Sequence, residues 1–123
     1  MKNWSFKQWN TLIGWVVFVI AFFTYLATIE PNFSFWDTGE YISSAVKLEV
    51  THAPGAALFQ LVGAVFAVFA FGNGENYSVV INSMSALFSA FTILFLFWTI
   101  THLVRRLLHK DFHEITKHQE ISI

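Results

Sequence analysis

Two long apolar stretches dominate the hydrophobic pattern of this chain. Residues 11–29 contain no Asp, Glu, Lys or Arg, and residues 79–104 form a second uncharged stretch that is longer still. A helix rises about 1.5 Å per residue, so residues 11–29 extend about 28 Å, close to the thickness of the hydrocarbon core of a bilayer. A cleaved signal peptide would need small residues before its cleavage site, which Tyr25 and Ile29 do not supply. The pattern therefore predicts two transmembrane helices, at 11–29 and 79–104.

The chain between these two stretches alternates polar breaks with shorter helical segments. Residues 30–32, Glu-Pro-Asn, end the first helix, because proline cannot continue a helix and disfavours helical geometry in the residue before it. Residues 34–50 follow as a predicted helix along the membrane surface. Charged residues such as Asp37 and Lys47 would each cost roughly 2.5–3.5 kcal/mol at the bilayer centre, so this segment is not expected to span.

A second juxtamembrane helix is predicted over residues 54–71. Pro54 suits the first turn of a helix, and the residues after it are apolar apart from Gln60. The apolar part, residues 56–71, is shorter than the usual membrane span of about 17–25 residues. We expect it to lie in the outer interface or to dip into the bilayer and return. A third crossing is the alternative.

Basic residues near both ends of the chain set the expected topology. Positive charges that flank membrane spans are enriched on the cytoplasmic side, and two basic ends on one side require an even number of crossings. We therefore expect residues 1–10 and 105–123 to be cytoplasmic and residues 30–78 to form an extracytoplasmic loop of an inner-membrane protein. The basic residues are Lys2, Lys7, Arg105, Arg106 and Lys110.

Composition supports an all-α integral membrane fold, with two transmembrane helices joined by an outer-face loop that carries juxtamembrane or re-entrant helices. Hydrophobic residues make up 55% of the chain and charged residues 12%, whereas about a quarter of the residues in soluble proteins are charged. The net charge of −1 does not provide the basic surface that a nucleic-acid partner requires. The sequence has no cysteine, so thiol chemistry is excluded. The lipid bilayer is the expected partner of the apolar surface.

Small and polar residues form a stripe along the second predicted span. Their spacings of three, four and three residues place them on one face of a helix. In membranes, such a face usually packs closely against another helix. We therefore expect further transmembrane helices, of a longer protein or of a partner subunit, to contact it. The stripe consists of Asn82, Ser85, Ser89 and Thr92.

Asp37, Glu40 and His52 are the candidate chemical groups of the chain. Asp37 follows Ser34 at the spacing of a capping box, which is the structural interpretation. Alternatively, partial desolvation between apolar elements would raise the pKa of a carboxyl group toward the range of a general base. The two carboxylates could also hold a divalent cation together with phosphate oxygens. A single histidine before a helix more often satisfies a local hydrogen bond.

Two motifs in the same region resemble a known family. They are W-D-T-G-E at residues 36–40 and H-A-P-G at residues 52–55. Together they are similar to the opening of the bacterial membrane-protein family of unknown function 2723, also grouped as glycosyltransferase family 117. That family belongs with the GT-C glycosyltransferases, whose relatives include the protein O-mannosyltransferases. The resemblance covers residues 11–106 and departs at Ala53, where the family commonly has a proline.

The resemblance implies transfer of a sugar from a polyprenyl-phosphate donor to an acceptor hydroxyl on the extracytoplasmic face. By that likeness Asp37 would be the catalytic base, and Glu40 would assist it or help to bind a divalent cation. His52 would lie near the phosphate of the donor. Trp36 and Lys47 would complete the substrate-binding residues.

The members of that family are much longer than this chain of 123 residues. The chain is therefore expected to be the amino-terminal portion of a larger membrane domain, and to be inactive by itself. The competing interpretation is a non-enzymatic small membrane protein or accessory subunit that docks through its polar stripe, or a membrane anchor. A docking subunit gains nothing from an outward-facing acidic pair, so Asp37 and Glu40 separate these classes.

Overall fold

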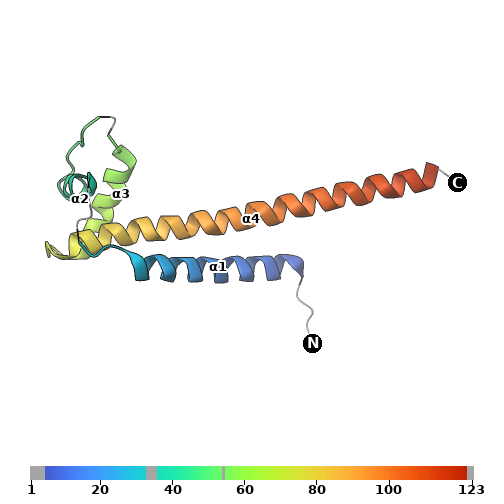
Figure 1. The fold of residues 1–123 in the computed structure, drawn as a ribbon, viewed down its shortest axis with the longest axis horizontal. Coiled ribbons are helices and arrows are strands. Elements are labelled where there is room, and N and C mark those ends of the chain that lie inside the picture. Colours follow the sequence, from blue (N-terminus) through green and yellow to red (C-terminus); the bar gives the residue numbers. More distant parts are fainter. Residues whose placement is uncertain (1–4, 33–35, 54, 122–123) are drawn as a thin grey trace. The chain divides into compact units, whose positions relative to one another are not determined.

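The computed structural model describes residues 5–32, 36–53 and 55–121, with the backbone alone for residues 109–121. The described residues are helical or irregular and contain no strand, which confirms the predicted all-α class. In chain order the elements are α1 (Phe6–Thr28), α2 (Thr38–Lys47), α3 (Ala57–Ala67), the 3-10 helix η1 (Val68–Ala70) and α4 (Asn76–Ile121), as Figure 1 shows.

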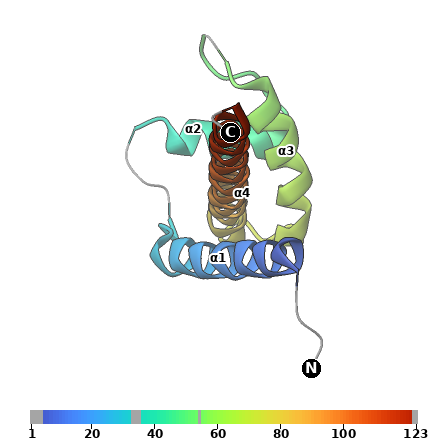
Figure 2. The same cartoon turned by 90° about the vertical axis from the view of Figure 1, so that its right-hand side faces the viewer.

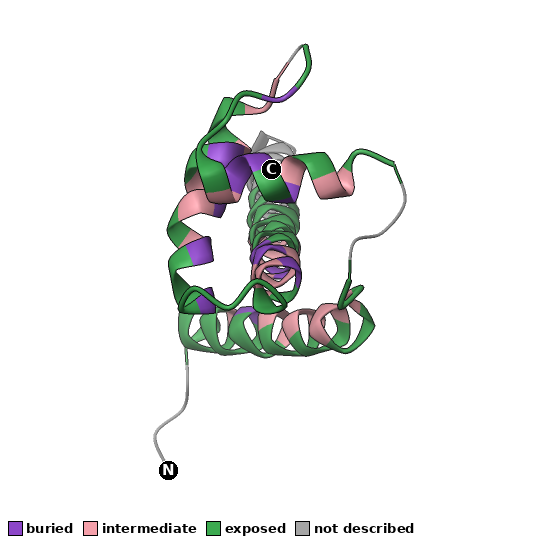
Figure 3. Cartoon of the chain, turned by 90° about the vertical axis from the view of Figure 1, so that its left-hand side faces the viewer, coloured by how far each residue is buried: buried purple, intermediate pink, exposed green. Residues whose placement is uncertain are grey.

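Two of these helices are long and apolar enough to cross a membrane. They cover Phe6–Thr28 and Asn76–Leu108, and the most apolar window of each has a mean hydropathy of 2.0. Only 6% and 28% of these windows are buried, so neither is the core helix of a soluble protein. Figure 3 shows the exposed residues that run along α1. The chain is therefore an all-α membrane protein with two candidate spans.

Both long helices extend beyond the predicted spans. α1 begins at Phe6 rather than residue 11, and α4 continues past residue 104 to Ile121. The sequence from 105 to 121 contains neither glycine nor proline, so nothing in it interrupts the helix. α4 therefore continues as a helix beyond the end of the part that can cross a membrane.

The chain divides into two compact units. The hairpin unit consists of Met1–Ala21 and Phe91–Ile123, and the loop unit consists of Phe22–Ala90. α1 and α4 each contribute residues to both units, whereas α2, α3 and η1 belong to the loop unit alone.

Antiparallel contacts between α1 and α4 hold the hairpin unit together. The ring centroids of Phe18 and Phe91 lie 4.7 Å apart. Closer to the amino terminus, the indole Nε1–H of Trp98 donates a hydrogen bond to the carbonyl oxygen of Asn10 at 3.3 Å. Gly14 lies against Trp98, where a Cβ atom would come within 2.9 Å of the indole atom Cε2. A glycine at this point lets the bulky indole approach the backbone.

The loop unit has its own small apolar core. α2 and α3 lie side by side, which Figure 2 shows from a second direction. Gly63 of α3 faces Ala45 of α2 so closely that an added Cβ atom would lie 2.9 Å from the Cβ atom of Ala45. The buried core residues are Ile42, Ala45, Ile81 and Met84, and the partly buried residues against them are Val46, Phe59, Val62, Phe66 and Tyr77.

The helix predicted over residues 34–50 is shorter in the structure. It ends at Lys47, because Leu48 adopts a left-handed backbone conformation with φ of 56°. The amide of Glu49 then donates to the carbonyl oxygen of Ser44 at 2.9 Å, and that of Leu48 donates to Ala45 at 3.4 Å. These two hydrogen bonds form a Schellman motif, with leucine at the position that glycine usually occupies.

The helix predicted over residues 54–71 is also shorter. α3 begins at Ala57, two residues after Gly55, whose left-handed φ of 70° does not belong to a helix. The helical path ends with η1 at Ala70, because Phe71 is again left-handed, with φ of 52°. Pro54, which was expected in the first turn, lies outside the described residues.

Candidate acid–histidine site

The candidate site begins where the chain enters α2. Asp37 is the residue immediately before this helix, and its carbonyl oxygen accepts a hydrogen bond of 2.9 Å from the amide of Tyr41. Trp36, just before it, has a positive φ of 69°, which is rare for a bulky side chain and marks a constrained backbone. Trp36 as a whole is 93% exposed.

The capping box predicted from Ser34 and Asp37 is not the geometry at this helix start. Asp37 occupies the N-cap position itself, three residues later than the prediction placed the helix start, and its side chain makes no capping hydrogen bond among the described residues. Ser34 lies outside the described residues. The Asp37 carboxylate is therefore not assigned to capping α2.

Glu40, in the first turn of α2, holds the loop that returns from the far end of the same helix. The backbone amide of His52 donates to Glu40 Oε1 at 2.9 Å. The imidazole atom Nδ1 lies 3.0 Å from both Oε1 and Oε2. We call these contacts, which join residues twelve positions apart, the Glu40–His52 clasp.

The clasp shifts the pKa of both partners. The backbone amide and the ring of His52 hold the pKa of Glu40 below its ordinary value of 4.5. The pKa of His52 is raised above 6.5, mainly by its hydrogen bond to Glu40 and next by the negative charge of the Glu40 carboxylate. For Glu40, the sequence-based expectation that desolvation would raise the pKa is therefore wrong, because hydrogen bonds to the ionised carboxylate outweigh the weak desolvation of an exposed side chain.

The second imidazole nitrogen of His52 faces Asp37. The distance from Nε2 to Asp37 Oδ2 is 3.9 Å, which is too long for a hydrogen bond but close enough for attraction between charges. About half of each side chain is exposed, 53% for His52 and 51% for Asp37. The ring of Tyr41 meets the imidazole edge to face, with 6.3 Å between centroids.

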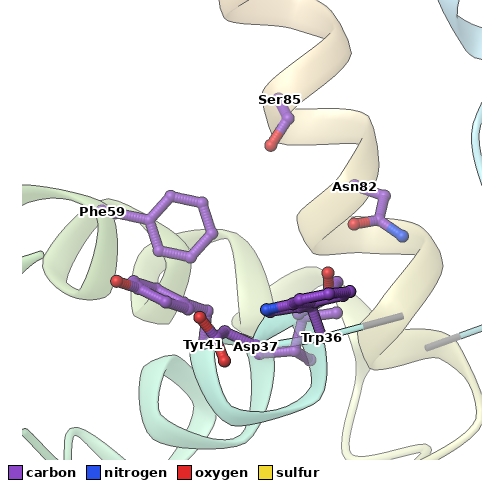
Figure 4. Close-up of a pocket in the computed structure, with 8 residues that line it drawn as sticks. Trp36, Asp37, Tyr41, Phe59, Asn82 and Ser85 are labelled. Carbon is purple, nitrogen blue, oxygen red and sulfur yellow. The ribbon is translucent and has the colours of Figure 1, made fainter. Parts of the chain in front are cut away.

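Asp37 also lines an open groove of about 410 Å³ in the loop unit. Figure 4 shows its labelled side chains, which come from the start of α2, from α3 and from α4. The volume falls within the usual range for small-molecule sites, and aromatic rings form much of the wall. The lining residues are Trp36, Asp37, Thr38, Tyr41, Ile42, Phe59, Asn82 and Ser85.

Sequence reasoning missed the contribution of α4 to this groove. Asn82 and Ser85 were predicted to form a helix-packing stripe, yet both line the groove. Asn82 also donates from Nδ2 to the carbonyl oxygen of Glu30 at 2.8 Å, which secures the segment after α1 to the start of α4. The signal in the sequence was their polarity inside an apolar run, which is compatible with either role.

Lys47 is not brought to the site. It is the last residue of α2, so at about 1.5 Å per residue it lies about 15 Å along the helix from Asp37. Asp37, Glu40, His52 and Trp36 do come together in the loop unit.

The carboxylates do not form a complete metal site. Within the part of the chain that the structure describes, no group of three or more His, Asp or Glu side chains is placed to hold a metal ion. Both oxygens of Glu40 already contact His52, which leaves Asp37 as the carboxylate that faces the groove. We therefore assign no step to a divalent cation.

Fold and site together define an all-α membrane protein with an acid–histidine site beside a groove, which is lined by the segment between the two candidate spans and by the start of the second span. Residues 37–123 match the family described as the Protein O-mannosyl-transferase TMEM260 N-terminal domain. The chain belongs to this family and is an O-mannosyltransferase-like amino-terminal region. The match begins at Asp37 and includes Glu40 and His52. No solved structure matches the chain.

Proposed function

We propose that this chain is the amino-terminal part of a GT-C-type glycosyltransferase that uses a polyprenyl-phosphate sugar. Mannose is the sugar that the name of the matched family indicates. The narrower relationship to the family of unknown function 2723 belongs to the same proposal and rests on the motifs at residues 36–40 and 52–55. The observation that carries the proposal is the Asp37 carboxylate in an open groove, 3.9 Å from a histidine.

In the proposed reaction, Asp37 accepts the proton of the acceptor hydroxyl. The oxygen of that hydroxyl forms a bond to the anomeric carbon, and the bond from this carbon to the phosphate oxygen breaks. The electron pair of the broken bond leaves with the phosphate. Asp37 suits the role of base because its carboxylate lies at the groove wall without a capping hydrogen bond among the described residues.

His52 and Trp36 complete the proposed site. A protonated imidazole beside the groove would attract the phosphate of the donor, and the raised pKa of His52 keeps it protonated to a higher pH. Trp36 lines the groove and is largely exposed, so its indole is free to cover a face of the sugar.

We further propose that the groove lies on the extracytoplasmic side of the inner membrane. In the hairpin unit, the guanidinium carbon of Arg105 lies 5.0 Å from the ring centroid of Phe6. Lys7, the neighbour of Phe6, and Arg105 therefore lie at the same end of the hairpin unit. A common end fits a common cytoplasmic side under the positive-inside rule.

Ligand binding by the chain in lipid nanodiscs tests the donor assignment. We expect a short-chain polyprenyl-phosphate mannose to bind, and His52→Gln to weaken binding more than the control Glu49→Gln, which changes a carboxylate in the loop just after α2. Asp37→Asn should not weaken binding, because it removes a negative charge beside the phosphate. Equal affinities of wild type and His52→Gln would contradict the proposed role of His52.

Transfer requires more of the enzyme than this groove. The groove is open, and Asp37 and His52 are about half exposed, so water is not excluded from the reacting atoms. We therefore expect the 123-residue chain to bind the donor without transferring mannose. In a polypeptide that joins it to the remaining family helices, Asp37→Asn should lower transfer by about 10²–10⁴-fold. Mannosylated product from the chain alone would refute the expected inactivity.

A further inference from the structure

The structure assigns Glu40 as a positioning residue, which holds His52 so that the free imidazole nitrogen faces the space in front of Asp37. The assignment rests on the proposed function for the identity of the ligand, an anionic phosphate group of the sugar donor. It differs from the expectation that Glu40 is a second catalytic carboxylate or a cation ligand.

Three contacts commit the Glu40 carboxylate to His52. Oε1 accepts from the backbone amide at 2.9 Å, and both oxygens lie 3.0 Å from Nδ1. Such a two-point hold fixes both the backbone and the ring plane of the histidine. Neither Glu40 nor His52 lines the groove, whereas Asp37 does. His52 lies beside the groove because its Nε2 atom is 3.9 Å from Asp37 Oδ2, and Glu40 contacts only the other side of the imidazole.

The clasp also sets the register of the loop after α2. From Lys47 back to Glu40 the helix measures about 10 Å, a distance that about three extended residues can cover, and residues 48–51 connect Lys47 to His52. The side chain of Thr51 is buried while that of His52 is half exposed, so the two neighbours face opposite sides of the loop. A slip of one residue would bury the imidazole and remove it from Asp37.

Hydrogen bonding decides which imidazole nitrogen remains available. Nδ1–H is donated to Glu40, which leaves Nε2 directed toward Asp37 without a hydrogen bond, at 3.9 Å from Oδ2. The charged groups that face the ring are Glu40 and Asp37, both contributed by the start of α2. The neighbouring groove residues from α3 and α4, Phe59, Asn82 and Ser85, are uncharged. In a protonated ring, Nε2–H can therefore donate to a phosphate oxygen that approaches from the solvent-exposed side of the ring, because the 3.9 Å between Nε2 and Asp37 Oδ2 leaves no room for an atom between them.

The experiment compares wild type, Glu40→Gln, His52→Gln and their double variant in lipid nanodiscs. NMR of ¹⁵N-labelled imidazoles follows the titration of His52. The signal of His52 is identified as the one that is missing from the spectrum of His52→Gln. The affinity for a short-chain polyprenyl phosphate is measured in parallel. Glu49→Gln is the matched control, and His52→Gln keeps the backbone amide that binds Glu40, so the loop stays anchored.

In Glu40→Gln we expect the His52 titration to move down toward 6.5, while Glu49→Gln leaves it unchanged. Affinity for the polyprenyl phosphate at pH 6.5 should fall about two- to fivefold, the range for an exposed charged pair. The double variant should lose no more than His52→Gln alone, because Glu40 acts through His52.

An unmoved His52 titration in Glu40→Gln, or additive losses in the double variant, would overturn the positioning role. If the His52 titration moves in Glu40→Gln but the wild-type chain binds no polyprenyl phosphate, the proposed donor is wrong. The positioning of His52 by Glu40 is then still supported.

Discussion

At the scale of single residues, Glu40 and His52 hold each other through three contacts, and Asp37 is the carboxylate that lines the groove beside them. Asp37, Glu40 and His52 stand out because the surrounding sequence is apolar. Glu40 contacts His52 because the loop after α2 folds back, which brings together two residues twelve positions apart. No rule of local residue spacing predicts this contact. The expected rise in the pKa of Glu40 is wrong for the same reason, because the hydrogen bonds from the backbone amide and the ring of His52 come from this distant contact.

The first residue-scale prediction concerns pH. The pKa of His52 is raised above 6.5, so its stabilisation of the clasp is complete below 6.5 and is lost as pH rises through the raised value. The pKa of Glu40 is lowered below 4.5, so its contribution is present above 4.5 and is lost as pH falls through the lowered value. Amide-exchange protection of His52, corrected for intrinsic rates, should therefore be greatest between about 4.5 and 6.5. Protection that stays constant up to pH 9 would contradict this.

The second residue-scale prediction concerns Gly55. Its φ of 70° lies in the left-handed region, and its amide donates to the carbonyl oxygen of His52 at 2.9 Å. Gly55→Ala should destabilise the loop by about 1–2 kcal/mol, because a Cβ atom disfavours this conformation. Denaturant unfolding in micelles measures the loss. Gly74→Ala is the control, since an added Cβ atom there meets nothing within 4 Å. Equal stabilities of the two variants would show that the left-handed geometry is not required.

At the scale of elements, hydrophobic periodicity predicts the helices and misplaces their ends. The prediction of a helix over 34–50 extends too far because Leu48 gives no sequence signal for a left-handed conformation, which glycine normally provides. The predicted helix over 54–71 begins too early, because the sequence does not show that the backbone of Gly55 is left-handed. Apolar runs show that a helix exists, whereas its last turn depends on contacts of single residues.

The element-scale prediction concerns the crossing of α2 and α3 at Gly63. Gly63→Ala would place a Cβ atom 2.9 Å from that of Ala45, so the helices must move apart. We expect a loss of about 1–3 kcal/mol, the usual effect of overpacking, measured by denaturant unfolding in micelles. Ala45→Gly should recover part of this loss in the double variant, because it removes the opposing atom. A double variant less stable than Gly63→Ala would contradict the proposed close crossing.

A second element-scale prediction concerns α1 and α4 in the hairpin unit. Gly14→Leu places a side chain where the indole of Trp98 lies, so the two helices cannot keep their contact. The hydrogen bond from Trp98 to the carbonyl oxygen of Asn10 should be lost with it. Indole N–H exchange of Trp98 should therefore accelerate in Gly14→Leu and remain slow in Gly74→Ala. Unchanged exchange in Gly14→Leu would show that the tight contact is not needed.

At the scale of the whole molecule, composition and the two apolar stretches were enough to predict an all-α membrane protein. The groove could not be predicted, because it combines the start of α2 with Phe59, Asn82 and Ser85 from two other helices. Ser85 and Asn82 carry the same sequence signal whether they pack against a helix or line a groove. The sidedness of the molecule rests on the basic residues at the two ends and stays a prediction.

Cysteine labelling can establish on which side of the membrane Asp37 and His52 lie. The sequence contains no cysteine, so single cysteines can be placed at Lys7, near the basic end, and at Glu49, in the loop that carries His52. A membrane-impermeant maleimide applied to intact bacterial cells that express the chain, with the outer membrane made permeable, should label Glu49→Cys. It should label Lys7→Cys only after the inner membrane is opened. Labelling of both positions from the same side of the inner membrane would contradict the proposed extracytoplasmic position of the groove.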